Sequence, residues 1–436
     1  MPFDLAAIRD PATADCRFED PHPVTLNEVP LTVFRVSYLS WESIDGTLKP
    51  IRIAGFAARP RAVSGRLAAV VQAHGLGGSA DEGSATNLAA RLGMFVVAFN
   101  GPGSGTSPEN TSEGRPSSYA SGYRMFDTLR DVRGSWFWAH TTAALRGLTC
   151  LATRSDVDSE RMGLTGFSAG AIASLLGAGI DSRVRAAVPL SGALAFVEAA
   201  RSPTAWEHSL LAQSGLTVKS PEWGILTREL LDPARALLGS NAKVFMINGS
   251  TDEFFPLTAH LLTLRSLSGG ETRTSLIGNF DHGCYKTTGG EPQSTIEQRA
   301  RLRDEGGQRA WFRHYLLGDR AYPTIPRSPV VTTAAAGTQT RFSATVDRPN
   351  TYLVEEVRLW WSGDNAYDFE SVALVHKSGN LYEKLAPLPV TATAVYFVDV
   401  QYRTGDWGVQ HRFSISSEPM MATGLVPHIR AIDNCL

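Results

Sequence analysis

The stretch RMGLTGFSAGAIASLLGAG, residues 161–179, passes from a strand-like segment into a small-residue helix through Gly-Phe-Ser-Ala-Gly. Ser168 stands between two glycines at this junction, which is the arrangement of a nucleophile elbow. A tight strand-to-helix connection also needs small residues for packing alone, so the motif has a purely structural interpretation as well. The strand pattern before Ser168 and the helix pattern after it favour the nucleophile.

Apolar runs of strand length recur on both sides of this stretch and alternate with helical patterns. Short continuous apolar runs are typical of strands that are covered on both faces of a parallel sheet. The expected strands are 31–41, 51–60, 67–74, 94–100, 161–166, 184–192, 243–250 and 272–280, and the expected helices include 83–92, 123–154 and 293–317. This alternation predicts an α/β fold, a doubly wound and mostly parallel sheet with helices on both faces.

The chain is long enough for a large domain and a smaller one. Extra helical patterns lie between the strands at 184–192 and 243–250, so we expect a helical cap there. Beyond the proline-rich PTIPRSPVV, short alternating segments predict an all-β sandwich of immunoglobulin or fibronectin type. The predicted organisation is an N-terminal surface extension at 1–30, a catalytic domain at 31–322 with the cap at 193–242, a β-sandwich domain at 330–418, and a C-terminal tail at 419–436.

A serine hydroxyl becomes a useful nucleophile only with a base and with an acid that orients the base. In folds with a nucleophile elbow the chain order is Ser, then Asp or Glu, then His. His282 follows the last expected sheet strand in NFDHGCY, and Asp252 follows a buried strand in KVFMINGSTDEFFP. Glu253 and Asp281 are the rivals of Asp252 for the acid. We expect Ser168, Asp252 and His282 to meet at one edge of the sheet.

Negative charge that develops during attack on a carbonyl needs two N–H donors, an oxyanion hole. The backbone N–H of Ala169, directly after the serine, is one candidate. The other is the N–H of Leu76 in HGLGG, residues 74–78, the loop that follows the strand at 67–74. We interpret His74 as a residue that shapes this loop.

Composition and motifs exclude several classes of function. The net charge is −2, with 41 basic and 43 acidic residues interspersed, so neither nucleic acid nor a membrane surface is an expected partner. The loop GPGSGTS, residues 101–107, lacks the nucleotide-binding spacings, and no metal-ligand cluster is visible. The expected partner is a small-molecule ester, with no metal and no cofactor; the sandwich is a plausible interface for a homo-oligomer.

Cysteine usage and the N-terminus bear on location. The cysteines Cys16, Cys150, Cys284 and Cys435 are scattered and form no CxxC pair, which argues against a zinc site or a disulfide framework. Such usage fits a reducing compartment. The N-terminus lacks a signal-peptide pattern, and no apolar run approaches the roughly 20 residues that span a bilayer. The expectation is a soluble, cytoplasmic protein.

With these residues in view, the first 320 positions resemble the α/β-hydrolase superfamily. They are most similar to its acetyl-xylan-esterase and dienelactone-hydrolase members, which shade into prolyl-oligopeptidase-like enzymes. VVQAHGLGG, RSDVDSERMGLTGFSAG, NGSTDEFFP and DHG carry the likeness. The sandwich, with DEFFP and VRLWWSGDNAYDFES, resembles the PhoPQ-activated pathogenicity-related proteins. The resemblance implies ester hydrolysis through an acyl-enzyme, with Ser168, Asp252 and His282 as triad.

Two departures and two alternatives accompany this resemblance. Ala171 replaces the last glycine of GxSxGG, and Leu76 stands where acetyl-xylan esterases often have tyrosine, which weakens a sugar-ester assignment. The same triad could serve a peptidase or amidase, although no β-propeller pattern is present. The chain could also be a binding protein with a vestigial hydrolase core, its sandwich holding carbohydrate through Trp360, Trp361 and Trp407. Tryptophans on sandwich strands are more often core.

Overall fold

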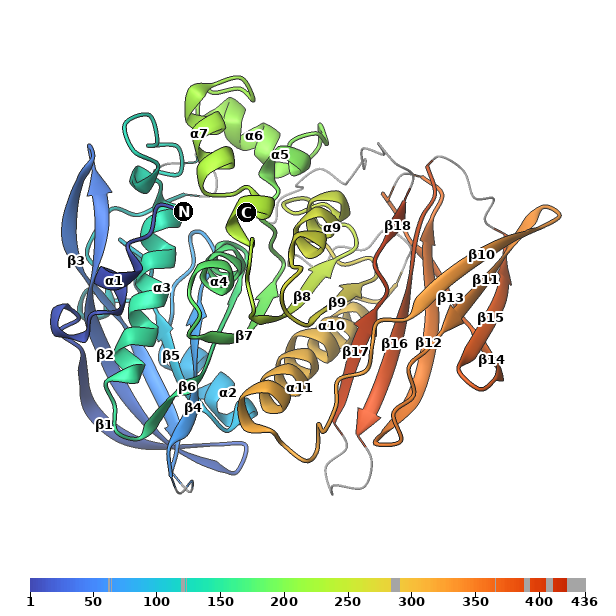
Figure 1. Ribbon diagram of the computed structural model, residues 1–436, viewed down its shortest axis with the longest axis horizontal. Helices are drawn as coiled ribbons and strands as arrows, with labels where there is room; N and C mark the ends of the chain where they lie inside the picture. The colour runs from blue at the N-terminus through green and yellow to red at the C-terminus, as the bar shows by residue number, and fades with distance from the viewer. Residues whose placement is uncertain are drawn as a thin grey trace.

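A computed structural model describes residues 1–61, 63, 65–118, 122, 124–283, 291–364, 366–387, 393–404 and 411–421. A parallel sheet forms its centre, in the order β5-β4-β6-β7-β8-β9 (Figure 1). These strands are β4 (Leu67–Ala73), β5 (Phe95–Phe99), β6 (Val157–Phe167), β7 (Val184–Leu190), β8 (Lys243–Gly249) and β9 (Thr272–Ile277). The apolar runs that predict strands are buried on both faces, and the doubly wound parallel sheet is confirmed.

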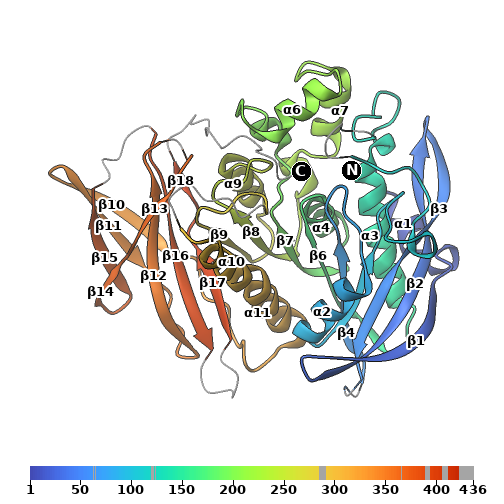
Figure 2. The same ribbon diagram turned by 180° about the vertical axis from the view of Figure 1, so that it is seen from behind.

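Helices cover both faces of this sheet (Figures 1 and 2). One face carries α2 (Glu82–Leu92), α10 (Gln293–Arg301) and α11 (Gln308–Phe312), and the other carries α3 (Trp136–Ala152), α4 (Ala169–Ile180) and α9 (Leu257–Ser266). The helix expected over 123–154 begins only at Trp136, after a 3-10 turn at Val132–Gly134. None of the described helices combines the length and the apolar character that crossing a membrane requires.

The N-terminal thirty residues differ from the surface extension that the sequence predicts. Strand β1 (Arg17–Leu26) pairs antiparallel with β2 (Val29–Ile44), which pairs with β3 (Thr47–Pro60), and β3 joins the parallel sheet through β5. Polar and proline residues are tolerated in β1 because it is an edge strand, mostly exposed on both faces. The first residues form the short helix α1 (Leu5–Arg9), which packs against α3.

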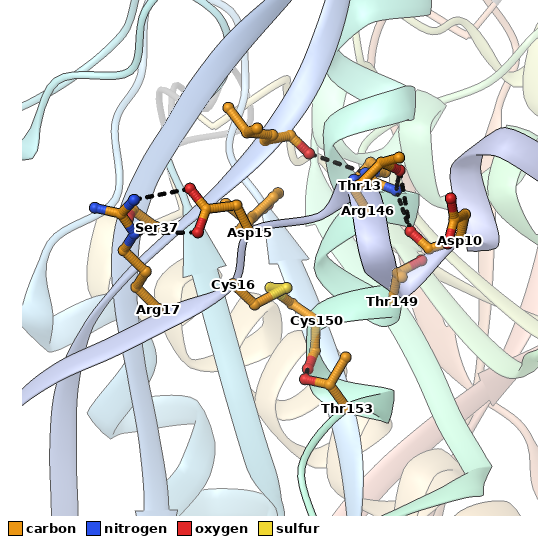
Figure 3. Close-up of a disulfide and its surroundings, with 12 residues drawn as sticks. Asp10, Thr13, Asp15, Cys16, Arg17, Ser37, Arg146, Thr149, Cys150 and Thr153 are labelled. Atoms are coloured by element: carbon orange, nitrogen blue, oxygen red, sulfur yellow. Dashed lines mark hydrogen bonds and ion pairs between the residues drawn. A yellow bond between two sulfur atoms is a disulfide. The ribbon is translucent and has the colours of Figure 1, made fainter.

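A disulfide between Cys16 and Cys150 joins this N-terminal segment to the last turn of α3 (Figure 3). The expectation of no disulfide was wrong, because the two cysteines are 134 residues apart and no local spacing reveals their pairing. Disulfides are rare in reducing compartments, so cysteine usage no longer supports a cytoplasmic location. Cys284 and Cys435 lie outside the described residues.

Arg146 of α3 fixes the same segment through hydrogen bonds (Figure 3). Its buried guanidinium donates to the backbone oxygens of Ile8 and Asp10, at 3.1 and 2.9 Å, and to that of Leu39 at 2.9 Å. The guanidinium also lies over the Trp41 ring, 4.6 Å from its centroid. Hydrogen bonds from a charged donor to several carbonyls offset the cost of burying the charge. Residues 1–16 are therefore an integral part of the fold.

Three helices of the 193–242 segment lie above the carboxyl ends of the parallel strands (Figure 1): α5 (Phe196–Ala199), α6 (Trp206–Gln213) and α7 (Pro221–Glu229). The fourth, α8 (Pro233–Ala236), packs against the C-terminal end of α4, where a Cβ at Gly179 would overlap the Ala236 oxygen. This is the segment for which the sequence predicts a helical cap. Its position places it over the edge of the sheet where β6, β8 and β9 end.

Two antiparallel sheets form the C-terminal region. One has the order β10-β11-β15-β14, with β10 (Val330–Ala336), β11 (Gln339–Thr345), β15 (Leu381–Ala386) and β14 (Val375–Ser378). The other contains β12 (Tyr352–Ser362), β13 (Glu370–Ala373), β16 (Val395–Thr404), β17 (Arg412–Ser416) and β18 (Met420–Met421). This second sheet continues the central one, because Ser416 of β17 pairs with Thr274 of β9.

Tryptophans of the sandwich belong to its interior where they are described. Trp360 and Trp361 on β12 are both buried, whereas Trp407 lies outside the described residues. Burial of these two rings removes them as an exposed carbohydrate platform.

We predict that replacing both bridged cysteines, Cys16→Ser with Cys150→Ser, lowers the free energy of unfolding by about 2–4 kcal/mol, because the bridge restricts a long loop of the unfolded chain. Urea denaturation of wild type and variant measures this difference. Alkylation followed by mass spectrometry provides the control: the two thiols should react only after reduction. Reaction of Cys16 and Cys150 in the native protein without reductant would contradict the bridge.

Candidate active site

The serine motif forms a strained turn between β6 and α4. Strand β6 ends at Phe167, helix α4 begins at Ala169, and Ser168 between them has φ 57° and ψ −117°. A non-glycine residue at such a φ is strained and is typical of functional sites. The flanking glycines have a packing reason: a Cβ at Gly166 would lie 2.5 Å from the Ala73 oxygen of β4, and one at Gly170 would overlap the same oxygen. Packing against β4 therefore requires glycine at positions 166 and 170, whereas the strained conformation of Ser168 indicates a functional role for the serine.

Side chains from three strand ends form a continuous hydrogen-bonded chain. His282 Nε2 lies 2.9 Å from Ser168 Oγ, and His282 Nδ1 lies 3.1 Å from each carboxylate oxygen of Asp252. Asp252 Oδ1 also accepts from the backbone N–H groups of Phe254 and Phe255, each at 2.9 Å. Because Nδ1 faces a carboxylate, it carries the proton, and Nε2 is free to accept one from the serine. The structure brings together the three residues that the sequence predicts.

The rival acids bind the backbone of the histidine loop. Glu253 Oε2 accepts from the backbone N–H of His282 at 3.1 Å, and Asp281 Oδ1 accepts from the N–H of Gly283 at 2.9 Å. Both carboxyl groups still lie close enough to the imidazole to act on its pKa. Burial alone would lower the pKa of His282, but Asp252, followed by Glu253 and Asp281, outweighs burial and raises that pKa.

A stack of aromatic rings holds the imidazole and connects it to the cap. The Phe254 ring stacks on His282, with centroids 4.1 Å apart and an interplanar angle of 20°, and Trp206 of α6 stacks on Phe254 at 4.8 Å. Phe167 lies on the imidazole too, at 5.0 Å. The Trp206 backbone N–H donates to the backbone carbonyl oxygen of Glu253 at 2.9 Å. This stack could not be predicted from the sequence, since DEFFP contains the phenylalanines but no local pattern pairs them with Trp206.

Glu207 of α6 is a second feature that the sequence analysis missed. Its side chain is fully buried, and neither carboxyl oxygen has a hydrogen-bond partner among the described residues. Burial, and then the charge of Asp252, raises the pKa of Glu207 well above the ordinary value. We therefore expect a neutral carboxylic acid beside the catalytic candidates. Glu207 lies in the short helix α6, where the local sequence does not indicate that its side chain is buried next to Asp252.

The loop that follows β4 lies against the serine turn. A Cβ at Gly75 would be 3.1 Å from the Ser168 Cβ, so Gly75, the neighbour of Leu76, adjoins the serine. His74 fixes the loop: its Nδ1 donates to the Gly75 oxygen at 2.6 Å, and its Nε2 accepts from the Gly101 N–H at 2.8 Å. The second predicted donor, Ala169, is the first residue of α4. Both predicted oxyanion donors therefore belong to segments that border Ser168.

No three His, Cys, Asp or Glu side chains within the part of the chain that the structure describes are grouped to hold a metal ion. The glycine-rich loop at 101–107 packs against the loop after β4, through the bond between Gly101 and His74.

Comparisons with known proteins agree with this fold. Residues 19–198 match the family model described as acetyl xylan esterase (AXE1). The acetyl xylan esterase from Paenibacillus sp. R4 is 17% identical, with a TM-score of 0.50 over 68% of this chain and 90% of that chain. Acetyl xylan esterase 1 from Thermoanaerobacterium sp. JW/SL YS485 is also 17% identical, with a TM-score of 0.49 over 68% and 93%. No curated protein matches the chain by sequence.

The chain has the α/β-hydrolase fold, and the matched family consists of carboxylic ester hydrolases. These findings support the same class for this protein. The family match spans residues 19–198, so it includes Ser168 but neither Asp252 nor His282.

We predict that Asp252→Asn lowers the pKa of the His282 imidazole, because it removes the charge that most strongly favours the protonated ring. Titration of the imidazole Cε1–H resonance by NMR measures the shift. Asp281→Asn is the matched control and should give a smaller decrease, since Asp281 contributes least among the three carboxylates. Equal shifts in both variants, or none in Asp252→Asn, would contradict the geometry.

Proposed function

We propose that this α/β-hydrolase is a serine carboxylic-ester hydrolase that works through an acyl-enzyme intermediate. Ser168 is the nucleophile, His282 the general base and acid, and Asp252 the group that orients and stabilises the imidazole. The observation that carries the proposal is the hydrogen-bonded chain from Asp252 through His282 to Ser168, with distances of 3.1 and 2.9 Å. Such a chain, ending on a serine in a strained turn, is the arrangement that activates a hydroxyl.

The proposed reaction has two halves. His282 Nε2 takes the proton of Ser168 as Oγ attacks the ester carbonyl, and the carbonyl oxygen becomes an oxyanion held by the N–H groups of Ala169 and Leu76. Collapse of this intermediate breaks the bond to the alcohol, which leaves with the proton from His282. Water, deprotonated by His282, then attacks the acyl-enzyme; the acid departs, and the proton returns to Ser168.

A small or medium ester fits the surroundings of the serine. Ser168 and His282 are only 7% and 8% exposed, so the reacting atoms are recessed beneath their neighbours. Phe167 is 40% exposed beside them and offers an apolar surface at the entrance. Small acyl groups, such as the acetyl group named in the matched family, are compatible with this recess. We propose a short acyl chain.

We predict that Ser168→Ala lowers ester turnover by several orders of magnitude without unfolding the protein, as loss of a triad member does. A panel of p-nitrophenyl esters graded by acyl length measures kcat/KM for wild type and variant, and aminoacyl anilides run in parallel test amide cleavage. The highest kcat/KM should fall on the shortest acyl chains.

Ser174→Ala is the matched control for this experiment. Ser174 lies on the same helix, and among the described residues its hydroxyl bonds only to the Gly170 oxygen in the preceding turn, at 2.8 Å, so its loss should leave turnover nearly unchanged. A fluorophosphonate probe should label wild type and Ser174→Ala but not Ser168→Ala. Near-normal turnover in Ser168→Ala would end the assignment, and preference for the anilides would replace esterase with amidase.

A further inference from the structure

The loop that carries His282 is held by the C-terminal sandwich. This loop begins at Gly278, directly after β9, and its second residue, Asn279, has φ 54°. The Asn279 side chain donates from Nδ2 to the Phe369 oxygen at 2.7 Å, and its Oδ1 accepts from the Phe369 N–H at 2.9 Å. Phe369 immediately precedes β13 of the sandwich. Two hydrogen bonds to one backbone unit fix the distance and the orientation of the loop.

Gly278 is fixed by the sandwich from its other side. A Cβ at Gly278 would overlap the buried ring of Trp360 on β12, so only glycine allows this approach. Arg299 of α10 lies over the same ring, 4.8 Å from its centroid, and donates to the Gly278 oxygen at 3.1 Å. Glu291 holds the Arg299 guanidinium through both carboxylate oxygens, at 2.8 and 2.7 Å. The start of the loop therefore has little freedom to move.

Hydrogen bonds also join the histidine loop to the loop that carries Asp252. The Asn279 backbone N–H donates to Ser250 Oγ at 2.9 Å, and the Thr251 N–H donates to the Phe280 oxygen at 3.1 Å. An apolar cluster joins these two loops to the sandwich; it consists of Leu257, Leu276, Trp360, Ala366, Phe369, Val395 and Phe397. Leu257 begins the helix after the acid loop, and Leu276 lies in the strand before the base loop.

We propose that two elements of the sandwich, strand β12 and the segment before β13, position the histidine loop, and that Asn279 is the positioning residue through which they place His282. The inference rests on the proposed function. The imidazole must lie within hydrogen-bond reach of Ser168 and Asp252 at the same time, and only two residues separate it from Asn279. A displacement of about 1 Å at a reacting group can cost roughly 100-fold in rate.

Asn279→Gly is the sharpest test, because glycine adopts the left-handed conformation of Asn279 while losing both bonds to Phe369. We expect kcat for the best ester to fall about 10- to 100-fold with KM nearly unchanged. The acidic limb of the pH–rate profile should move to lower pH, because a looser contact with Asp252 favours protonated His282 less. The downfield resonance of the imidazole Nδ1 proton should broaden.

Two further variants separate positioning from general instability. Phe342→Leu truncates a buried ring in the other sheet of the sandwich, on β11, and should lower stability without changing kcat or the pH profile. Asn279→Asp keeps the acceptor for the Phe369 N–H but replaces the donor with a carboxylate that faces Glu291, so its kcat should be lower than that of wild type. It also provides the measurement if the glycine variant does not fold.

The outcomes are distinguishable from those that test the reaction itself. Wild-type kcat and pH profile in Asn279→Gly, or equal loss of kcat in Asn279→Gly and Phe342→Leu, would overturn the positioning role. If only Asn279→Asp folds, wild-type values in that variant would do the same. Each of these results would leave the esterase proposal intact, provided Ser168→Ala is inactive, whereas an active Ser168→Ala would overturn the esterase proposal.

Discussion

The close passage of β4 beneath the serine turn determines most of the site. The Ala73 oxygen at the end of β4 occupies the space that side chains at positions 166 and 170 would need. Glycine at both positions lets strand and helix approach, and the chain can then reverse only through a residue with positive φ, which is Ser168. The same approach brings the residues after Ala73 beside the serine, so one packing contact sets both the nucleophile and the loop that we propose as oxyanion donor.

Charge is the second constraint, because several carboxyl groups surround one buried imidazole. Carboxyl groups that lie close together and out of water cannot all ionise. Burial, followed by the charge of Asp252, raises the pKa values of Glu253 and Glu207. Asp252, in contrast, accepts hydrogen bonds from three N–H donors, those of Phe254, Phe255 and the imidazole. The geometry thus separates the residue that orients the base from the residues that only surround it.

The sequence predicts those features that depend on local patterns. Strands covered on both faces must be apolar throughout, so β4, β5 and β8 could be recognised from composition alone. Side chains that follow such strands collect at one edge of the sheet, which is why Ser168, Asp252 and His282 could be placed together. The start of α3 was misplaced by about a dozen residues, because the aromatic spacing continues through the irregular segment before Trp136.

Features that join distant segments could not be predicted in this way. The Cys16–Cys150 bridge, the Trp206–Phe254 stack and the Asn279–Phe369 bonds each connect residues whose own surroundings in the sequence give no hint of the partner. They depend on how the cap and the sandwich dock on the sheet. That docking follows from surfaces formed only after the central strands have assembled.

Strand β9 explains why the sandwich is more than an appended module. It is the last parallel strand, and without a neighbour it would present an open edge with unpaired backbone groups. Strand β17 pairs with it through Thr274 and Ser416, and the Ser416 hydroxyl accepts from the Leu276 N–H at 2.8 Å. A buried ion pair also holds the sandwich against the catalytic domain: an Arg303 guanidinium nitrogen, just after α10, lies 2.5 Å from Asp399 Oδ2 on β16. The strand that leads to the histidine is therefore completed by the second domain, and its geometry depends on that domain being in place.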